Sequence, residues 1–380
     1  MAQRLKTDWI LFLTVLCLVC FGLVMVYSAS SIVAELKYHV SSTYFFVRQL
    51  GWAIFSFLIL LYSMKRDYRR WNDPRCAFAG LGVVLLLLVL VYFTDGSSHR
   101  WLKAGPFSLQ PSELAKPALA LFLAFFLSRR MGVVNDRHTL RPIAVSICMI
   151  ALAVAVADLG TAVVIVATSM VVVFVAGLES RYLVVCAILA ALLGVGFIAM
   201  KPYRLARAVE FLDKDHKLLA KIDPQGRILE YARKTASTSD PGYQQRQSKI
   251  AIGSGGLVGL GLMESKQKML YLPEAHTDFI FGVVGEETGL LGCGFLLCGF
   301  LVVLWRGMRV YFHAADDFGR YLALSVTVLV VVQAFINMSV VLDLVPNKGI
   351  PLPFISYGGS SLLSTLMSMG MLLSVSEHAG

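Results

Sequence analysis

Charged residues are scarce in this chain of 380 residues. Lys, Arg, Asp and Glu together make up 15% of it, hydrophobic residues make up 57%, and the mean hydropathy is +0.71. An average soluble domain carries roughly 25% charged residues. The composition therefore excludes an ordinary soluble protein and indicates an integral membrane protein.

Several chemical signatures are also missing. All seven cysteines lie in or at the ends of apolar runs, and none lies in the long polar segment 201–277, so a secreted disulfide framework is not indicated. The glycine-rich stretch 253–261 has neither the Gly-Lys-Ser/Thr ending of a P-loop nor the G-x-G-x-x-G spacing. The sequence contains no His and Cys cluster suited to zinc and no G-x-S-x-G motif. We expect no bound nucleotide and no nucleic-acid partner.

Apolar runs of about 20 residues, the length that spans a bilayer as a helix, recur along the chain. They predict an all-α, polytopic integral membrane protein, with residues 1–380 forming a single membrane domain. The first run follows Arg4 and Lys6 as a signal peptide would, but it is long enough to span and more runs follow it. We therefore expect ten transmembrane helices, at about 9–28, 44–63, 76–94, 112–128, 142–157, 160–177, 182–200, 278–304, 321–342 and 353–375.

The distribution of Lys and Arg predicts the orientation of these helices. The connections at 64–75, at 128–142 and after residue 304 are rich in Arg, whereas the connection at 29–43 has only Lys37. This bias places the even-numbered connections and both termini in the cytoplasm, and the loop 201–277 outside. The loop holds 13 Lys and Arg against 8 Asp and Glu, which suggests an anionic partner such as phosphate-bearing head groups, or else an ordinary solvated loop.

Ionisable residues in apolar segments are costly and usually mark function. Here they gather in the outer halves of the expected helices, while the inner halves are almost purely apolar. A transport path should be polar across its full depth, so the pattern favours chemistry at the outer surface. Outside the cytoplasm, a lipid pyrophosphate is a suitable activated donor. The outer polar residues include Arg100, Lys103, Glu113, Lys116, Asp158, His276, Asp278, Glu286, Glu287, Asn337, Asp343, Lys348 and the stretch 351–361 with Ser356.

The stretch 271–289 combines a His, a Thr and an Asp with three glycines. If its helix begins near His276, then Asp278, Gly282, Gly285 and Gly289 share one helical face. Such glycines allow close helix packing or line a groove for a lipid tail. Asp278 is either a functional acid or the N-cap of the helix. Similarly, Glu113 and Lys116 either bind the substrate or pair with each other at i, i+3.

Several blocks rich in polar and small residues lie along the chain. They are Arg100-Trp101, QPSELAK at 110–116, DLGT at 158–161, GYQQ at 242–245, IAIGSGG at 250–256, LPEAHTDFIFGVVGEETG at 272–289 and PNKGIPLPFISYGGSS at 346–361. In these blocks the chain resembles the FtsW/RodA/SpoVE family of shape, elongation, division and sporulation proteins. Asn347-Lys348-Gly349 and VYSAS at 26–30 look more like the division branch than the elongation branch. Two features depart from the family: Ala157 replaces a common Pro, and the loop carries extra sequence at about 215–240, whose middle, 222–236, could form a basic helix.

The resemblance implies a peptidoglycan glycosyltransferase that polymerises lipid II on the outer face of the cytoplasmic membrane at the division septum. It also implies a class B penicillin-binding protein, other division proteins and membrane lipids as partners. A lipid II flippase and a non-catalytic division scaffold are the alternatives. Mg²⁺ or Mn²⁺ could assist, although no metal ligands are readable. Asp278 is the expected catalytic base, and the expected substrate-binding residues are Arg100, Lys103, Glu113, Lys116, His276, Lys348 and Ser356.

Overall fold

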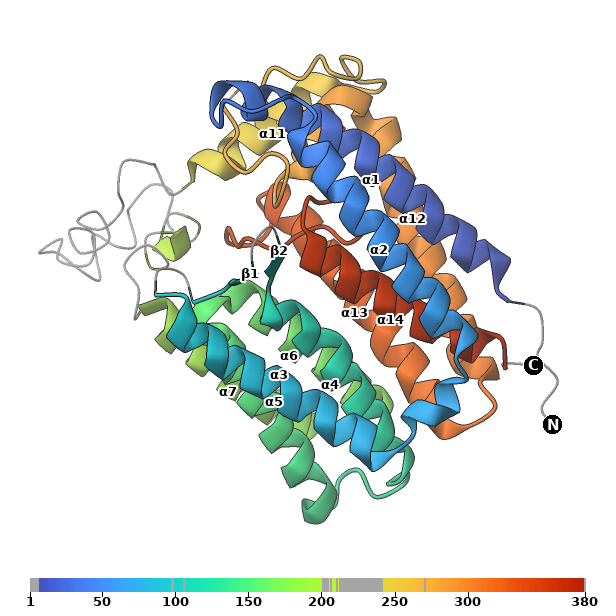
Figure 1. The fold of residues 1–380 in the computed structure, drawn as a ribbon. Helices are drawn as coiled ribbons and strands as arrows, with labels where there is room; N and C mark the ends of the chain where they lie inside the picture. Colours follow the sequence, from blue (N-terminus) through green and yellow to red (C-terminus); the bar gives the residue numbers. More distant parts are fainter. Residues whose placement is uncertain are drawn as a thin grey trace, which may run out of the picture.

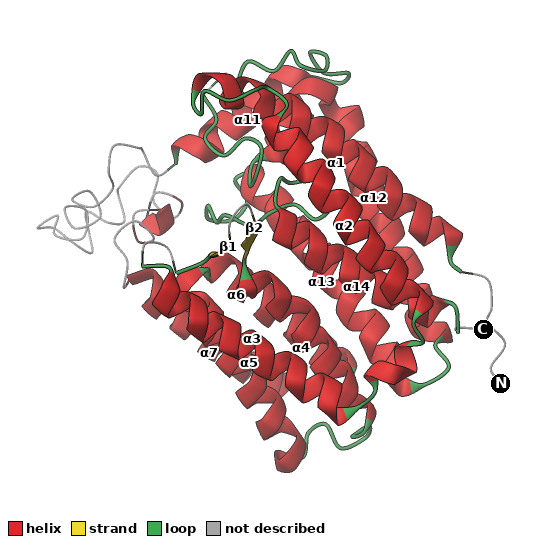
Figure 2. Ribbon diagram, in the orientation of Figure 1, coloured by secondary structure: helices red, strands yellow, loops and turns green. Residues whose placement is uncertain are grey.

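A computed structural model describes residues 7–96, 99–104, 107–199, 205, 207–209, 211, 242–269 and 271–378. The basic helix expected at 222–236 lies outside these residues. The described chain is almost entirely helical (Figure 1, Figure 2). Its elements are α1 (Trp9–Leu36), α2 (Tyr44–Lys65), the short 3₁₀ helix η1 (Tyr68–Trp71), α3 (Pro74–Thr94), β1 (Leu102–Ala104), β2 (Phe107–Leu109), α4 (Pro111–Ser128), α5 (Arg137–Ala157), α6 (Leu159–Val175), α7 (Ser180–Ala199), α11 (Tyr243–Gly255), α12 (Ile280–His313), α13 (Asp317–Val341) and α14 (Gly359–Ser376).

The number of membrane helices agrees with the sequence. Among the described residues, nine helices are long and apolar enough to cross a membrane, and α6, a shorter apolar helix of 17 residues, corresponds to the remaining one of the ten expected helices. The boundary between α5 and α6 is set by Asp158, whose carboxylate accepts hydrogen bonds from the backbone N–H (3.1 Å) and the hydroxyl (2.8 Å) of Thr161. Asp158 therefore caps α6 and is the single residue that separates α6 from α5.

The two chain ends meet at one end of the helix bundle (Figure 1). The hydroxyl of Thr7 donates to Glu377 (3.0 Å), and Arg306 pairs with Asp8 (2.7 Å). The β1–β2 hairpin, α11 and the connection between α13 and α14 lie at the opposite end, which we call the cavity end. One end of the bundle thus carries the chain termini, and the other carries the hairpin, α11 and the connection between α13 and α14.

Helices α14, α4 and α13, in that order, are the most deeply buried spans, whereas none of the apolar stretch of α7 is buried within the protein. Helix α14 carries serines along its whole length, so the expectation of nearly apolar inner halves holds for ionisable groups but not for hydroxyls. Ser364 and Ser368 donate to carbonyls of their own helix, three and four residues back. Both bonds lie within the helix, as is common for serines in membrane helices, and Ser364 also donates to Oε2 of Glu113 on α4 (3.3 Å).

Several helix starts differ from the expected ones by a few residues, and two of these differences lie at the segments that precede α12 and α14. Helix α12 begins at Ile280 and has non-helical dihedrals at Gly289 (φ 64°, ψ −159°), so Asp278 and Gly289 do not share a helical face with the glycines between them. Helix α14 begins at Gly359 and not at residue 353, because residues 353–358 form a turn in which Phe354 has a positive φ of 67°. The segments just before α12 and α14 have no apolar periodicity, so the sequence could not show where these helices begin.

The glycines of α12 serve close packing, one of the two alternatives left open by the sequence. A β-carbon on Gly285 would lie 2.7 Å from the side chain of Ile252 in α11. Gly282 faces the same helix, with Ser248 at 3.3 Å from its β-carbon position. The missing side chains let α11 lie directly on α12.

Candidate active site

A cavity of about 710 Å³ lies at the cavity end of the bundle. Its walls come from α2, the β-hairpin, the turn between α5 and α6, the connection between α13 and α14, and the segment just before α12. Cations outnumber carboxylates among its described lining residues, which suits an anionic ligand. The charged and titratable lining residues are Arg48, His99, Arg100, Asp158, Arg207, Glu274, Asp278 and Lys348.

The backbone around Asp278 is held by side chains from two neighbouring elements. Asn337 on α13 donates one amide to the carbonyl of Asp278 (2.8 Å) and to that of Ile350 (2.6 Å). Ser356 donates its hydroxyl to the carbonyl of Thr277 (2.6 Å). These bonds tie the segment before α12 to the connection before α14, so the two walls of the cavity are fixed together.

Gly349 packs directly against the carboxyl group of Asp278. A β-carbon on Gly349 would lie 2.5 Å from Oδ2 and 3.4 Å from Cγ of Asp278. Contacts that short are essentially never observed, so only glycine leaves the carboxylate in this position.

The carboxylate of Asp278 differs from the other two cavity carboxylates in accepting no hydrogen bond from a described residue. Asp158 accepts from Gln110 (3.0 Å) and from Thr161, and Glu274 accepts from the hydroxyl of Thr277 (3.0 Å). Within the described parts of the chain, no hydrogen bond or ion pair reaches the carboxylate of Asp278. Helix α12 has Phe279 at its N-cap, with no side-chain bond to the helix, so the capping alternative for Asp278 is wrong.

Burial also changes the acidity of this group. Desolvation raises the pKa of Asp278 to about 7, with smaller contributions from Glu274 and Asp158 and an opposing effect of Arg100 and Arg207. Asp278 lies before the first residue of α12, outside the membrane-spanning helix. A base with a pKa near the working pH combines a useful ionised fraction with strong proton affinity.

Arg100 is held against the end of α5. Its Nε donates to the carbonyl of Ala157 (2.7 Å), and its backbone N–H donates to Asp95 (3.1 Å). From this position its positive charge acts on Asp278. Lys348 also lines the cavity, beside Gly349. Of the eight residues expected from the sequence, Asp278, Arg100 and Lys348 therefore line the cavity.

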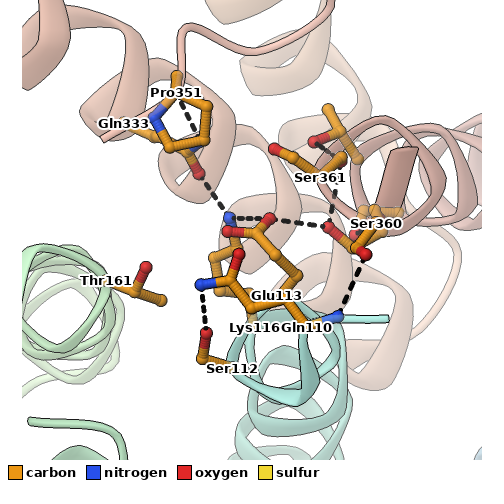
Figure 3. Close-up of polar contacts among 12 residues, drawn as sticks. Gln110, Ser112, Glu113, Lys116, Thr161, Gln333, Pro351, Ser360 and Ser361 are labelled. Carbon is orange, nitrogen blue, oxygen red and sulfur yellow. Dashed lines mark hydrogen bonds and ion pairs between the residues drawn. The ribbon is translucent and has the colours of Figure 1, made fainter. Parts of the chain in front are cut away.

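Glu113 and Lys116 lie behind the lining, and both are almost fully buried. They form an ion pair of 2.7 Å, and Lys116 also donates to Oε1 of Gln333 (2.8 Å) (Figure 3). Gln333 in turn donates to the carbonyl of Pro351, a cavity-lining residue (2.8 Å). The structure thus shows the pairing that the i, i+3 spacing allowed, and connects the pair to the cavity wall through Gln333.

The other three expected residues also lie outside the lining. His276 is buried between the rings of Phe45 and Tyr357, with centroids 5.1 and 5.7 Å away, and burial lowers its pKa. Ser356 is occupied by its bonds to Thr277 and to the backbone N–H of Leu352 (2.8 Å). Lys103 is exposed on β1. His276 and Ser356 therefore support the backbone of the site.

Several lining residues were missed by the sequence analysis. Arg48 had a usable signal, because it is the only charged residue in the second predicted helix, 44–63. Trp52 lies one helical turn further on and also lines the cavity. Gln244 also had a signal, because it belongs to the GYQQ block at 242–245. Arg207 comes from the long loop, where one charged residue among many carries no signal.

Comparisons with known proteins identify the family of the chain. A family model described as a cell cycle protein, FtsW/RodA/SpoVE, matches residues 8–380. The chain belongs to the FtsW/RodA/SpoVE family. It is 40% identical to a probable peptidoglycan glycosyltransferase FtsW of Geobacter metallireducens, over 98% of this chain and 95% of that protein. It is 37% identical to the stage V sporulation protein E of Bacillus subtilis, over 99% of both.

Solved structures of similar proteins share the fold. One is a chain from a peptidoglycan synthase complex, in work on the structural coordination of polymerization and crosslinking, with a TM-score of 0.74, 27% identity and 98% coverage of both chains. Another is the rod shape determining protein RodA of Thermus thermophilus, with a TM-score of 0.68, 26% identity, and coverage of 99% of this chain and 98% of that one. The chain is thus a multi-pass membrane protein of the FtsW/RodA/SpoVE type.

Glu286 and Glu287 have structural partners in this FtsW/RodA/SpoVE protein. Glu287 accepts from Lys268 (2.8 Å) and from Ser28 on α1 (2.6 Å), and the side chains of Lys268 and Glu287 are both 0% exposed. Glu286 accepts from the hydroxyl of Ser265 and from the N–H of Lys266 (2.9 Å). Lys268 is therefore a buried structural residue and not one of the solvated loop lysines that the sequence suggested.

No metal centre is apparent in the part of the chain that the structure describes, where no three His, Cys, Asp or Glu side chains lie close enough together to hold an ion. The expectation that Mg²⁺ or Mn²⁺ assists the reaction stays a prediction.

Proposed function

We propose that this protein is a peptidoglycan glycosyltransferase that polymerises lipid II into β-1,4 glycan strands, with Asp278 as the general base. The observation that supports this most directly is the state of Asp278. Its carboxylate lines a cavity with four cationic side chains, accepts no hydrogen bond from a described residue, and has its pKa raised to about 7. The names of the relatives support the same activity.

The reaction is a single displacement. Asp278 takes the proton of the acceptor sugar hydroxyl, and that oxygen attacks the anomeric carbon of the donor. The bond from this carbon to the pyrophosphate oxygen breaks, the configuration inverts, and undecaprenyl pyrophosphate leaves with the bonding electron pair. General-base catalysis contributes about 10²–10⁴-fold. Arg100, Arg207 and Lys348, which line the same cavity, stabilise the charge that the leaving group gains.

We further propose that the cavity end faces the outside of the cytoplasmic membrane and that both termini are cytoplasmic. The Arg-rich connections gather at the end where the termini meet, as positive-inside topology requires. Two cysteines introduced into a cysteine-free background test this. One at Glu264 should react with a membrane-impermeant thiol reagent on spheroplasts, and one at Arg75 should not. The reverse pattern would overturn the orientation.

A class B penicillin-binding protein is the proposed partner, at the division septum. One similar chain comes from a complex described as coordinating polymerization and crosslinking. Co-purification from native membranes, followed by polymer assays with and without the partner, tests the proposal. We expect more glycan with the partner present. Equal yields would remove the activating role.

The decisive experiment is Asp278→Asn, assayed with purified protein and lipid II. This change keeps the size of the side chain and removes its basicity. The variant should fold and bind lipid II but form little or no glycan. Glu264→Gln is the matched control, because it neutralises an exposed acid that does not line the cavity and should polymerise normally.

Near-normal synthesis by a folded Asp278→Asn protein would contradict the assignment of the base. A flippase would instead form no glycan even with the unmodified chain, and would carry lipid II across liposome membranes. A scaffold would do neither.

A further inference from the structure

The break in α12 is filled by another part of the chain. Non-helical dihedrals at Gly289 interrupt the helix, and such an interruption in a membrane helix needs partners for the freed backbone groups. The loop 256–261, which follows α11, supplies both donors and acceptors. The bonds run from Leu260 N–H to the Glu286 carbonyl (3.0 Å), from Gly261 N–H to the Glu287 carbonyl (3.0 Å), from Leu290 N–H to the Gly256 carbonyl (3.0 Å) and from Leu291 N–H to the Leu257 carbonyl (3.2 Å).

Glycines allow this loop to lie directly on the helix. A β-carbon on Gly255 would be 2.0 Å from the carbonyl oxygen of Gly285, and one on Gly259 would be 2.1 Å from that of Glu287. Gly256, Gly259 and Gly261 also adopt positive φ angles of 58°, 91° and 113°. The backbone of the loop is therefore fixed to α12, and its side chains point away from it.

Those outward side chains are apolar. Leu257 is 71% exposed and Val258 is 74% exposed. They continue the exposed apolar surface of α12 itself, where Leu290 is 63% and Leu291 is 69% exposed. Because α12 crosses the membrane, its exposed apolar surface faces lipid, and the loop extends that surface.

The length of α12 gives the depth of the loop. A helix of 34 residues is about 50 Å long at 1.5 Å per residue, whereas the hydrocarbon core needs only about 20 residues. Exposed Trp305 and its neighbour Arg306 mark one boundary of that core. About 20 residues back along the helix lies Glu286, at the level of the loop. The loop therefore lies at the opposite boundary of the hydrocarbon core.

We propose that the loop 256–261 is inserted into the leaflet at the cavity end, with Leu257 and Val258 in contact with phospholipid acyl chains. The occupant of this surface is the bilayer itself. Tyr271, also exposed and close in sequence, is the type of side chain that lies at the head-group level above such an insertion.

The insertion would fix the height of the segment that carries Asp278. The loop is bonded to the same helix that begins just after this residue. If the proposed function holds, the acid has to meet a pyrophosphate that its lipid tail keeps at the membrane surface. The insertion itself does not depend on that function.

The test uses the full chain in nanodiscs, in a cysteine-free background whose folding is checked by thermal melting. An environment-sensitive NBD dye is attached at Val258→Cys and challenged with spin-labelled acyl chains. The controls are Leu291→Cys, on the lipid-facing surface of α12, and Glu264→Cys, an exposed polar position in the same connection. The dye at residue 258 should show a blue-shifted emission and be quenched by the acyl-chain label as strongly as the dye at residue 291.

Emission and quenching like those at residue 264 would place the loop in water and overturn the proposal. A blue-shifted emission without acyl-chain quenching would also overturn it, because the loop would then be covered by protein, such as a second copy of the chain. A measurement on the unmodified protein gives an independent answer. A phospholipid with a diazirine on its acyl chain should label the peptide that contains Leu257 and Val258, and absence of label there, with label on α12, contradicts the insertion.

Discussion

Replacing Gly349 with alanine should displace the carboxylate of Asp278, the proposed base, without unfolding the protein. The new β-carbon would lie 2.5 Å from Oδ2 of Asp278, and contacts below 3.0 Å are essentially never seen, so one of the two groups must move by about 0.5 Å or more. Gly349 is exposed, and its φ is not among the positive values, so alanine itself fits the backbone. A displacement of 1 Å in a catalytic geometry can reduce the rate by about 10²-fold.

We therefore expect Gly349→Ala to reduce kcat for glycan formation by about 10- to 100-fold, equivalent to about 1.4–2.7 kcal/mol in the barrier. The melting temperature should change little. Gly82→Ala is the matched control, because a β-carbon there meets nothing within 4 Å. Initial rates of polymerisation at saturating lipid II, measured beside thermal melts, give both quantities. A folded Gly349→Ala protein with the parental kcat would refute the idea that this contact positions the acid.

Three further predictions concern charge. A general base must be ionised, so kcat/KM should fall tenfold per pH unit below about pH 7, which is the raised pKa of Asp278. The raised pKa also means that ionisation of Asp278 opposes folding. The Asp278→Asn protein should therefore melt no lower than the parent at pH 8. Lys268→Met should destabilise the protein by about 3–5 kcal/mol by leaving a buried carboxylate unpaired, and adding Glu287→Leu should restore much of the loss in chemical denaturation. Arg100→Ala should lower kcat/KM by about 10- to 150-fold, as expected for a charge-assisted contact of about 1.5–3 kcal/mol. Lys116→Ala should chiefly lower the melting temperature. The opposite pattern would mean that Lys116 binds the substrate and Arg100 has the structural role.

The membrane helices could be predicted from the sequence because each is encoded locally. The length of an apolar run such as 44–63 predicts the length of its helix, and the helix that forms there is Tyr44–Lys65. The pairing of Glu113 with Lys116 was also within reach, since three residues of helix fix their separation. Local features of this kind need no knowledge of the rest of the fold.

The remaining features depend on contacts between distant parts of the chain. Lys268 looked like a loop lysine because the sequence does not show that the chain folds its ammonium group onto Glu287 and onto Ser28, which is 240 residues away. The capping role considered for Asp278 failed because the helix starts later, after a segment shaped by Asn337 and Ser356. The role of Gly349 became visible only once its neighbour in space was known.

The loop that fills the break in α12 also determines how this region can open. The amides of Leu260 and Gly261 are bonded to carbonyls of α12, and those of Leu290 and Leu291 are bonded to carbonyls of the loop. None of these four amide hydrogens can exchange with solvent unless the loop and the helix separate, so all four should report a single opening free energy in native-state hydrogen exchange. Two stretches of backbone that lie about thirty residues apart in the sequence thus behave as one cooperative unit, whose opening would loosen the segment that carries the acid.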